Sequence, residues 1–361
     1  MKTVRKILLL TIFSAIFLVP LGTMAASNKP IYSAWVPYWK KTEAAKETIA
    51  NLSKLGEISP FSYTVKPTGE LVDTMKLDSE PWPALLKKAR AKKVKILPAI
   101  MWSDSVAIDK VLSNANARKD HIDKIMKEVT TRKFDGIDID YENKYASTSP
   151  YFSTFLGELG VKLHAKKKTL SCTIEARTPP DSRFLTVPKV LEYANDFPTI
   201  NKYCDQVRLM TYDQGTGDIK LNMEKRKGAL YYPIADSAWV RKVVELALKD
   251  IDANKIMLGV ANYGYELEIT DKVKFFDYKK IRSLTYKDLQ TLSGEQKIKP
   301  FRNNAGELSL IYVKAGKIRY VSFSDAQAMA DKFAIAKQYN LRGVAIFKID
   351  GEGDKYWEKV K

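Results

Sequence analysis

Eight short apolar runs recur at regular intervals along this chain of 361 residues, and amphipathic segments separate them. The runs are rich in β-branched and aromatic residues, which is typical of strands. The expected strands are 31–36, 58–65, 94–101, 134–141, 169–174, 206–211, 256–261 and 343–348. The expected helices are 43–55, 83–92, 106–132, 150–166, 237–251 and 324–339. This alternation predicts an α/β fold, a (β/α)8 TIM barrel whose final helix is vestigial because few residues follow the last strand.

One segment interrupts the alternation between the seventh strand and its helix. Residues 262–323 are too many for a bare loop in a compact domain. They contain a capped helix start at 285–288 and a hairpin of two strands, 308–313 and 318–323, that turns through 314–317. We therefore expect a small α+β insertion within the barrel at this place.

Acidic residues crowd the end of the fourth predicted strand. Alternation along the strand places Asp138, Asp140 and Glu142 on one face, and the intervening Ile and Tyr residues on the other. Three stacked carboxyl groups repel one another, so some must be protonated or hydrogen-bonded. A cation-binding loop is the alternative, but Gly136 comes too early for an EF-hand loop. We interpret the strand as a site of chemistry.

Two sequence segments resemble the signatures of a known family. Residues 135–142 read D-G-I-D-I-D-Y-E, and residues 210–213, at the end of the sixth predicted strand, read M-T-Y-D. They are similar to the D-G-x-D-x-D-x-E and M-x-Y-D motifs of glycoside hydrolase family 18, the chitinase-type family. Barrels of that family often carry an insertion where this chain has one. The resemblance implies a retaining glycosidase that uses the substrate's own 2-acetamido group as the nucleophile.

The resemblance also implies a role for each acidic residue. Glu142 would protonate the leaving oxygen and later deprotonate the attacking water, while Asp140, held near Asp138, would orient the acetamido N–H. The Tyr212 hydroxyl would hold the acetamido carbonyl, and Asp213 would bind sugar hydroxyls. No metal and no organic cofactor is required by this scheme.

Further side chains are expected at the C-terminal ends of the strands, where a sugar chain would lie. The candidates for substrate contact are Met210, Trp35, Trp39, Trp102, Tyr263 and Phe347. Core packing is the alternative for each of them, because Met and aromatic residues are common in interiors. Glu175 and Arg177 also point toward this end of the fifth strand, either into the site or toward each other as a buried ion pair.

Two positions depart from the family pattern. Typical chitinases have S-x-G-G at the end of the third strand, where residues 96–102 here read I-L-P-A-I-M-W. They also have a Trp on the eighth strand beneath the cleaved sugar, where this chain has Phe347. The predicted catalytic acids are unaffected by these departures. The expected substrate is either chitin or chito-oligosaccharides, or peptidoglycan.

The N-terminus has the pattern of a secretory signal. Three basic residues precede an apolar run at 7–19, and small residues follow at 25 and 26. We expect a signal peptide at 1–26 and an exported barrel at 27–361 without stable membrane insertion, an uncleaved anchor being the alternative.

The chain is strongly basic. The formal net charge of +18 falls to +15 without residues 1–26, which carry three positive charges and no negative ones. Lys and Arg are spread along the chain without a nucleic-acid-binding motif, so the expected partner is an anionic cell-wall surface rather than nucleic acid. A basic surface that only aids solubility is the alternative.

The two cysteines and two histidines allow few special sites. Alternation places Cys172 on the helix-facing side of its strand and Cys204 on the barrel-facing side of the next. A disulfide would suit an oxidising compartment, but this geometry predicts two buried free thiols. His121 and His164 both fall in helical segments, which argues against a zinc site or a His-based triad.

Two other functions compete with hydrolysis. A catalytically silent, chitinase-like lectin would keep the barrel, but lectins of that kind typically lose the residue at Glu142, which is present here. A scaffold or adhesion role is neither supported nor excluded by the sequence. Binding without turnover would distinguish both from an enzyme.

Overall fold

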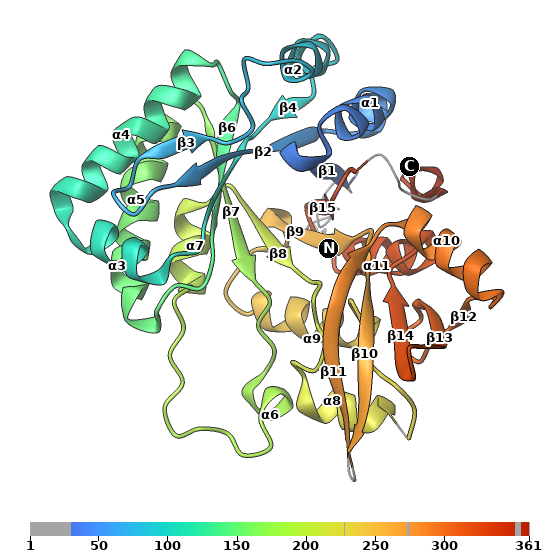
Figure 1. The fold of residues 1–361 in the computed structure, drawn as a ribbon. Helices are drawn as coiled ribbons and strands as arrows, with labels where there is room; N and C mark the ends of the chain where they lie inside the picture. The colour runs from blue at the N-terminus through green and yellow to red at the C-terminus, as the bar shows by residue number, and fades with distance from the viewer. Residues whose placement is uncertain (1–29, 227, 273–274, 351–354, 361) are drawn as a thin grey trace, which may run out of the picture.

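The computed structural model describes residues 30–226, 228–272, 275–350 and 355–360 (Figure 1). The predicted signal peptide lies outside the described residues. No helix within these ranges is both long and apolar enough to span a membrane.

A closed parallel barrel forms the body of the protein, as the alternation predicts. The barrel strands are β1 (Ile31–Val36), β2 (Glu57–Val65), β5 (Ala99–Trp102), β6 (Gly136–Tyr141), β7 (Thr169–Glu175), β8 (Gln206–Met210), β9 (Ile256–Ala261) and β15 (Gly343–Phe347). Their order is β1-β15-β9-β8-β7-β6-β5-β2, and the pairing of β1 with β2 closes the ring. Two short strands are added at β2, namely β4 (Lys95–Ile96), parallel to it, and β3 (Leu71–Asp73), antiparallel to it. The (β/α)8 prediction is confirmed.

Helices surround the barrel (Figure 1). The longer ones are α1 (Lys41–Asn51), α2 (Trp82–Ala91), α3 (Ser105–Ser113), α4 (Ala115–Thr131), α5 (Ser149–Ala165), α7 (Phe197–Tyr203), α8 (Ile219–Arg226), α9 (Ser237–Ala247) and α11 (Ala326–Gln338). The short ones are α6 (Pro180–Arg183) and the 3-10 turns Tyr38–Lys40, Leu52–Lys54, Ala146–Thr148, Ala253–Lys255 and Lys355–Glu358. The single helix predicted over 106–132 is wrong, because Asn114 ends α3 and caps α4 by accepting the Ala117 N–H (3.0 Å).

The predicted insertion follows β9 and precedes α11. Its elements are β10 (Gly264–Lys272), β11 (Phe275–Leu284), α10 (Tyr286–Gln296), β12 (Phe301–Arg302), β13 (Leu308–Lys314) and β14 (Lys317–Phe323). The strands form an antiparallel sheet in the order β11-β10-β14-β13-β12. The predicted hairpin is β13–β14, and the predicted helix start is a capping box between Thr285 and Asp288. The long pair β10–β11, which stands beside the barrel in Figure 1, was not predicted from the sequence.

The two cysteines form a disulfide, so the prediction of two free thiols is wrong. The error lies in the placement of Cys204. It follows α7 as its C-cap residue and comes before β8 begins at Gln206, so strand alternation does not apply to it. Cys204 therefore lies with Cys172 in the apolar layer between barrel and helices, with their Cα atoms 6.1 Å apart.

The barrel interior contains a buried ionic cluster below the C-terminal rim. Arg208 on β8 is fully buried, and its guanidinium donates to Glu57 (2.9 Å), Asp138 (3.1 Å) and the Ser33 hydroxyl (3.1 Å). The Trp35 ring lies 4.9 Å from the guanidinium carbon. Buried charges are tolerated only when they are paired and hydrogen-bonded in this way. The cluster therefore stabilises the two carboxylates inside the barrel.

Removal of the guanidinium should destabilise the fold strongly. An Arg208→Met variant leaves Glu57 and Asp138 buried without their cation, and such a change typically costs about 3–5 kcal/mol. We expect a correspondingly lower free energy of unfolding in urea titrations. Arg90→Met is a suitable control, because Arg90 is an exposed residue that donates to the Arg132 carbonyl (2.9 Å). Equal stability of the two variants would contradict this account of the barrel interior.

Candidate active site

Strand β6 carries the three predicted acids from the barrel interior to its rim. Asp138 and Asp140 are buried, with 0% and 4% of their surfaces exposed, and Glu142 lies half-buried just past the strand. Ile137 and Ile139 pack in the apolar layer on the other side. The alternation seen in the sequence therefore holds, and the acids lie one above another along the strand.

Asp138 is the deepest acid and is fully hydrogen-bonded. Its carboxylate accepts from Ser171 (2.6 Å), Thr173 (3.0 Å), Arg208 (3.1 Å) and the Trp35 indole (3.2 Å). These donors come from β7, β8 and β1, so three other strands of the barrel fix its position. The negative charge of Asp138 is thus compensated within the barrel.

Asp140 lies two residues further along β6, nearer the rim, and its hydrogen-bonding capacity is not fully used. Its Oδ1 atom is buried and has no hydrogen-bond partner among the described residues. Burial raises the pKa of Asp140 well above its usual value, and the nearby charges of Glu142 and Asp138 raise it further. A buried acceptor without a donor is costly in a resting protein, which points to a ligand that supplies the donor.

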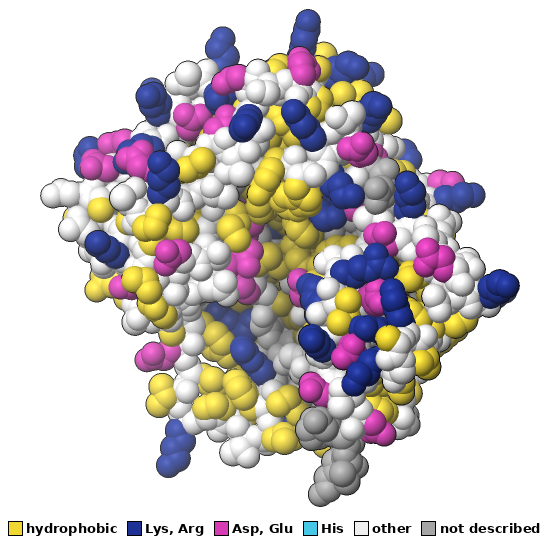
Figure 2. Space-filling view, viewed as in Figure 1, with side chains coloured by type: hydrophobic (Ala, Val, Ile, Leu, Met, Phe, Trp, Pro, Cys, Tyr) yellow, Lys and Arg dark blue, Asp and Glu magenta, His cyan; other side chains and the backbone are white. Residues whose placement is uncertain are grey.

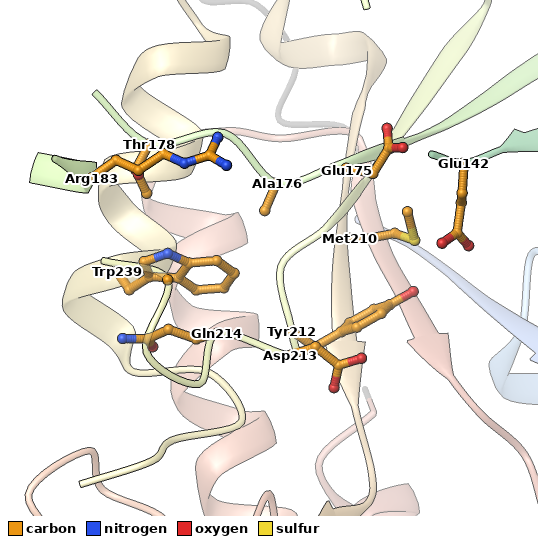
Figure 3. Close-up of a pocket in the computed structure, with 11 residues that line it drawn as sticks. Glu142, Glu175, Ala176, Thr178, Arg183, Met210, Tyr212, Asp213, Gln214 and Trp239 are labelled. Atoms are coloured by element: carbon orange, nitrogen blue, oxygen red, sulfur yellow. The ribbon is translucent and has the colours of Figure 1, made fainter. Parts of the chain in front are cut away.

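Glu142 extends into a pocket of about 300 Å³ at the rim (Figure 3). Burial raises the pKa of Glu142, the charges of Glu175 and Asp213 raise it further, and Lys144 opposes them. The pocket is lined by Glu142, Glu175, Ala176, Thr178, Arg183, Met210, Tyr212, Asp213, Gln214, Gly217 and Trp239. A carboxyl group with a raised pKa in an open pocket can act as a general acid.

Glu175, at the end of β7, holds the turn that follows Glu142. Asn143 adopts a left-handed conformation (φ 55°), and its N–H donates to Glu175 Oε1 (3.1 Å). The Asn195 side chain donates to Glu175 Oε2 (2.7 Å). The turn brings Lys144 back beneath the site, where its side chain is fully buried and its ammonium lies 3.8 Å from Glu175.

The predicted alternative for Glu175, an ion pair with Arg177, is wrong. Arg177 donates to the Asn195 carbonyl (2.6 Å) and lies against the rings of Tyr193 (3.7 Å) and Phe197 (4.1 Å). The cation near Glu175 is Lys144, which sequence reasoning missed because only the left-handed turn at Asn143 places it there. Burial lowers the pKa of Lys144.

The M-T-Y-D segment supplies the opposite wall. The Tyr212 ring stacks on Phe347 with centroids 5.5 Å apart, and burial, followed by the charge of Asp140, raises the pKa of Tyr212 well above its usual value. Asp213 has a left-handed backbone (φ 57°) and accepts hydrogen bonds from the hydroxyls of Tyr263 (2.6 Å) and Tyr265. Tyr212 therefore presents a protonated hydroxyl, and Asp213 is held rigidly.

The predicted aromatic contacts divide into three groups. Trp102 packs on Tyr141 (5.3 Å) and His121 (5.4 Å) between barrel and helices, so its prediction as a substrate contact is wrong. Its strand register pairs it with Tyr141, which faces outward, and this explains the error. Trp35, 2% exposed, and Tyr263, 5% exposed, support Asp138 and Asp213 from below.

Trp39 and Phe347 remain candidates for contact with a ligand. Trp39 follows β1 and is 46% exposed, with its ring 5.6 Å from that of Phe61. Phe347 is half-buried and contacts the rings of Trp35, Tyr212 and Tyr263. Figure 2 shows hydrophobic side chains around a hollow near the middle of the visible face, while Lys and Arg are scattered over the rest. No group of three or more potential metal ligands occurs within the described part of the chain.

Comparisons with known proteins agree with this geometry. The sequence profile of Glycosyl hydrolases family 18 matches residues 34–352. The Bacillus subtilis protein named uncharacterized glycosylase YvbX is 25% identical over 285 residues, covering 76% of this chain and 77% of that protein. The cortical fragment-lytic enzyme of the same organism is 22% identical, covering 87% of this chain and 68% of that enzyme.

Solved structures share the fold at low identity. The spore cortex-lytic enzyme SleL of Bacillus megaterium superposes with a TM-score of 0.73 at 20% identity, over 92% of this chain and 73% of that one. A chitinase from Chromobacterium violaceum superposes with a TM-score of 0.74 at 20% identity, over 92% and 98% of the two chains. Because the family profile matches most of the sequence, the chain belongs to glycosyl hydrolase family 18 and is a glycoside hydrolase.

Proposed function

We propose that this protein is an exported, retaining glycosidase that cleaves β-1,4 bonds after N-acetylglucosamine in chitin or peptidoglycan, with the substrate's acetamido group as the nucleophile. The buried Oδ1 atom of Asp140, which has no partner among the described residues, supports this proposal most directly. An acetamido N–H is a donor of suitable size and charge for that acceptor. Asp140 is also too buried to be the nucleophile that most retaining glycosidases use.

The first step is displacement of the leaving sugar. The acetamido oxygen attacks the anomeric carbon, the glycosidic C–O bond breaks, and Glu142 transfers its proton to the leaving oxygen. Burial of Glu142 keeps that proton available by raising its pKa. Asp140 accepts the acetamido N–H and offsets the positive charge of the cyclic oxazolinium intermediate.

The second step reverses the proton transfer. Glu142, now a carboxylate, removes a proton from water as the water attacks the anomeric carbon, and the oxazolinium ring opens to regenerate the acetamido group. The Tyr212 hydroxyl donates a hydrogen bond to the acetamido oxygen, while Phe347 supports the sugar ring from below. Asp213 accepts a hydrogen bond from a sugar hydroxyl. The configuration at the anomeric carbon is therefore retained.

The location and the polymer are proposed from the charge of the surface, the N-terminal residues and the similar proteins. The basic surface (Figure 2) and the signal-like residues 1–26 favour an enzyme that works outside the membrane on an anionic wall. Similar proteins that are named a chitinase and a cortex-lytic enzyme keep both polymers as candidates. A silent carbohydrate-binding lectin remains the second candidate, and the presence of Glu142 disfavours it.

Loss of the acid should strongly reduce turnover. A Glu142→Gln variant keeps the shape of the side chain but cannot transfer a proton, so kcat should fall about a hundredfold to ten-thousandfold. Product release from chito-oligosaccharides and peptidoglycan would be compared for residues 27–361 of the wild type, Glu142→Gln and the control Glu43→Gln, which changes an exposed residue of α1. Cello-oligosaccharides lack the acetamido group and should not be hydrolysed.

Three outcomes would contradict the proposal or its mechanism. Full activity of Glu142→Gln would exclude Glu142 as the acid. Hydrolysis of cello-oligosaccharides at comparable rates would exclude participation of the acetamido group. Tight binding without turnover by the wild type would favour the lectin.

The charges of Glu175 and Lys144 should shift the pH dependence in opposite directions. Glu142 must be protonated for the first step, so activity falls as pH rises through its pKa. Glu175→Gln removes a negative charge that raises this pKa, and the alkaline limb of kcat/KM should move to lower pH. Lys144→Met removes the opposing positive charge, and the same limb should move to higher pH.

The profiles of kcat/KM against pH for the two variants and the wild type provide the measurement. The amide carbonyl oxygen that Glu175→Gln introduces can still accept the Asn143 N–H, so the first variant keeps the turn. Shifts in the same direction, or unchanged profiles, would show that these charges do not set the pKa of Glu142.

A further inference from the structure

The pocket at the rim has two ends of opposite character. Glu142, Glu175 and Asp213 make the catalytic end acidic. The other end is formed by Arg183 from α6, Trp239 from α9 and Gln214, and Figure 3 shows these three side chains apart from Glu142. The mechanism above uses no residue of this second end, which we call the Arg183 end.

The positive charge of Arg183 is available to a ligand. Its side chain is exposed, its guanidinium lies 5.3 Å from the Phe184 ring, and no carboxylate among the described residues lies within 4.0 Å of it. The neighbouring acid Asp218 is already engaged, because it accepts from Ser182 (2.8 Å) and pairs with Lys242 (3.2 Å). Arg183 is thus an uncompensated cation in the pocket lining.

Gln214, at the same end of the pocket, belongs to a buried polar network. The residue is 97% buried, its Oε1 accepts the Asp236 N–H (2.7 Å), and its side chain lies by the Tyr231 hydroxyl, which donates a hydrogen bond to Asp236 (2.8 Å). Figure 3 shows the Trp239 ring between the Gln214 amide and the Arg183 guanidinium. The charge that this end offers to a ligand is therefore that of Arg183.

We propose that the Arg183 end binds a carboxylate carried by the residue next to the sugar that is cleaved. A carboxylate supplies two acceptors for the guanidinium fork of Arg183. The acidic catalytic end would repel the same group, so opposite charges at the two ends fix the direction and register of an anionic chain. This inference rests on the proposed function and extends it to the choice of polymer.

The polymer that fits is one in which N-acetylglucosamine alternates with an acidic sugar. Muramic acid in peptidoglycan carries a lactyl carboxylate. This carboxylate is free in glycan strands without peptides, and it is linked to the peptide through an amide bond in strands that carry peptides. The peptides attached to such strands carry further carboxylates. Chitin is neutral and cannot use Arg183 in this way. The enzyme therefore prefers the anionic glycan to chitin of equal length.

A comparison of matched substrates tests the proposal. The substrates are peptide-free glycan strands, the same strands with their carboxylates converted to amides, peptide-bearing strands, and N-acetylglucosamine oligomers of equal length. The wild type, Arg183→Gln, Arg183→Lys and Lys220→Gln would be assayed for kcat/KM on each. Lys220 is an exposed residue of α8 outside the pocket lining, so its variant controls for a general loss of charge.

We expect the wild type to prefer free carboxylates over amides. Arg183→Gln should reduce that preference about tenfold, which corresponds to about 1.4 kcal/mol, because it removes a charge-assisted hydrogen bond. Activity on N-acetylglucosamine oligomers should stay unchanged. Arg183→Lys should keep part of the preference for free carboxylates, and Lys220→Gln should keep all of it. Added salt should weaken the preference of the wild type. A preference seen only with peptide-bearing strands, and lost in Arg183→Gln, would assign the carboxylate to the peptide.

The results that would overturn the inference differ from those that would overturn the function. If the wild type cleaves free and amidated strands equally, or if Arg183→Gln lowers activity equally on all substrates, carboxylate recognition at the Arg183 end is wrong while the hydrolase stands. If the wild type cleaves none of the four substrates, the proposed function itself fails.

Discussion

Inside the barrel, the Arg208 guanidinium donates to two carboxylates, to Asp138 from Nη1 and to Glu57 from Nη2. Each would be prohibitively unstable in an apolar interior without that cation. With it, β6 can carry a further acid, Asp140, directly above a compensated one. The stack of acids at the rim therefore depends on an ion pair that lies below the pocket and does not line it.

The number of hydrogen-bond donors around the acids of β6 decreases from the barrel interior toward the rim. Asp138 has donors for both oxygens, Asp140 Oδ1 has no hydrogen-bond partner among the described residues, and Glu142 faces the pocket. Burial raises the pKa values of both Asp140 and Glu142. The charges of Glu142 and Asp138 raise the pKa of Asp140 further, and those of Glu175 and Asp213 raise the pKa of Glu142 further. The charges of Glu175 and Lys144 shift the pKa of Glu142 in opposite directions. Strand β6, which lies over the ion pair of Arg208, thus carries both the proposed proton donor, Glu142, and the proposed acceptor for an N–H group, Asp140.

Much of this arrangement could be predicted from local sequence. Period-two alternation placed Asp138, Asp140 and Glu142 on the inner face, and a repeated strand–helix pattern predicted the barrel that presents them. Such signals are local and depend only on regular geometry. The predicted hairpin β13–β14 and the cap at Thr285 were confirmed for the same reason.

The errors and omissions concern places where regular geometry ends. Cys204 lies before β8 begins, so alternation assigned it to the wrong side. Lys144 reaches the site only because Asn143 is left-handed, and Arg183 reaches the pocket from the short helix α6 in the connection between β7 and α7. The position of such residues depends on tertiary packing that no period in the sequence encodes.

The most direct test of the retaining mechanism is the configuration of the first product. Proton NMR of an N-acetylglucosamine oligomer during the first minutes of hydrolysis, before mutarotation, would distinguish the two anomers. Our account predicts the β-anomer, because attack by the acetamido oxygen and then by water inverts the anomeric carbon twice. Release of the α-anomer would require direct attack by water and would contradict the account.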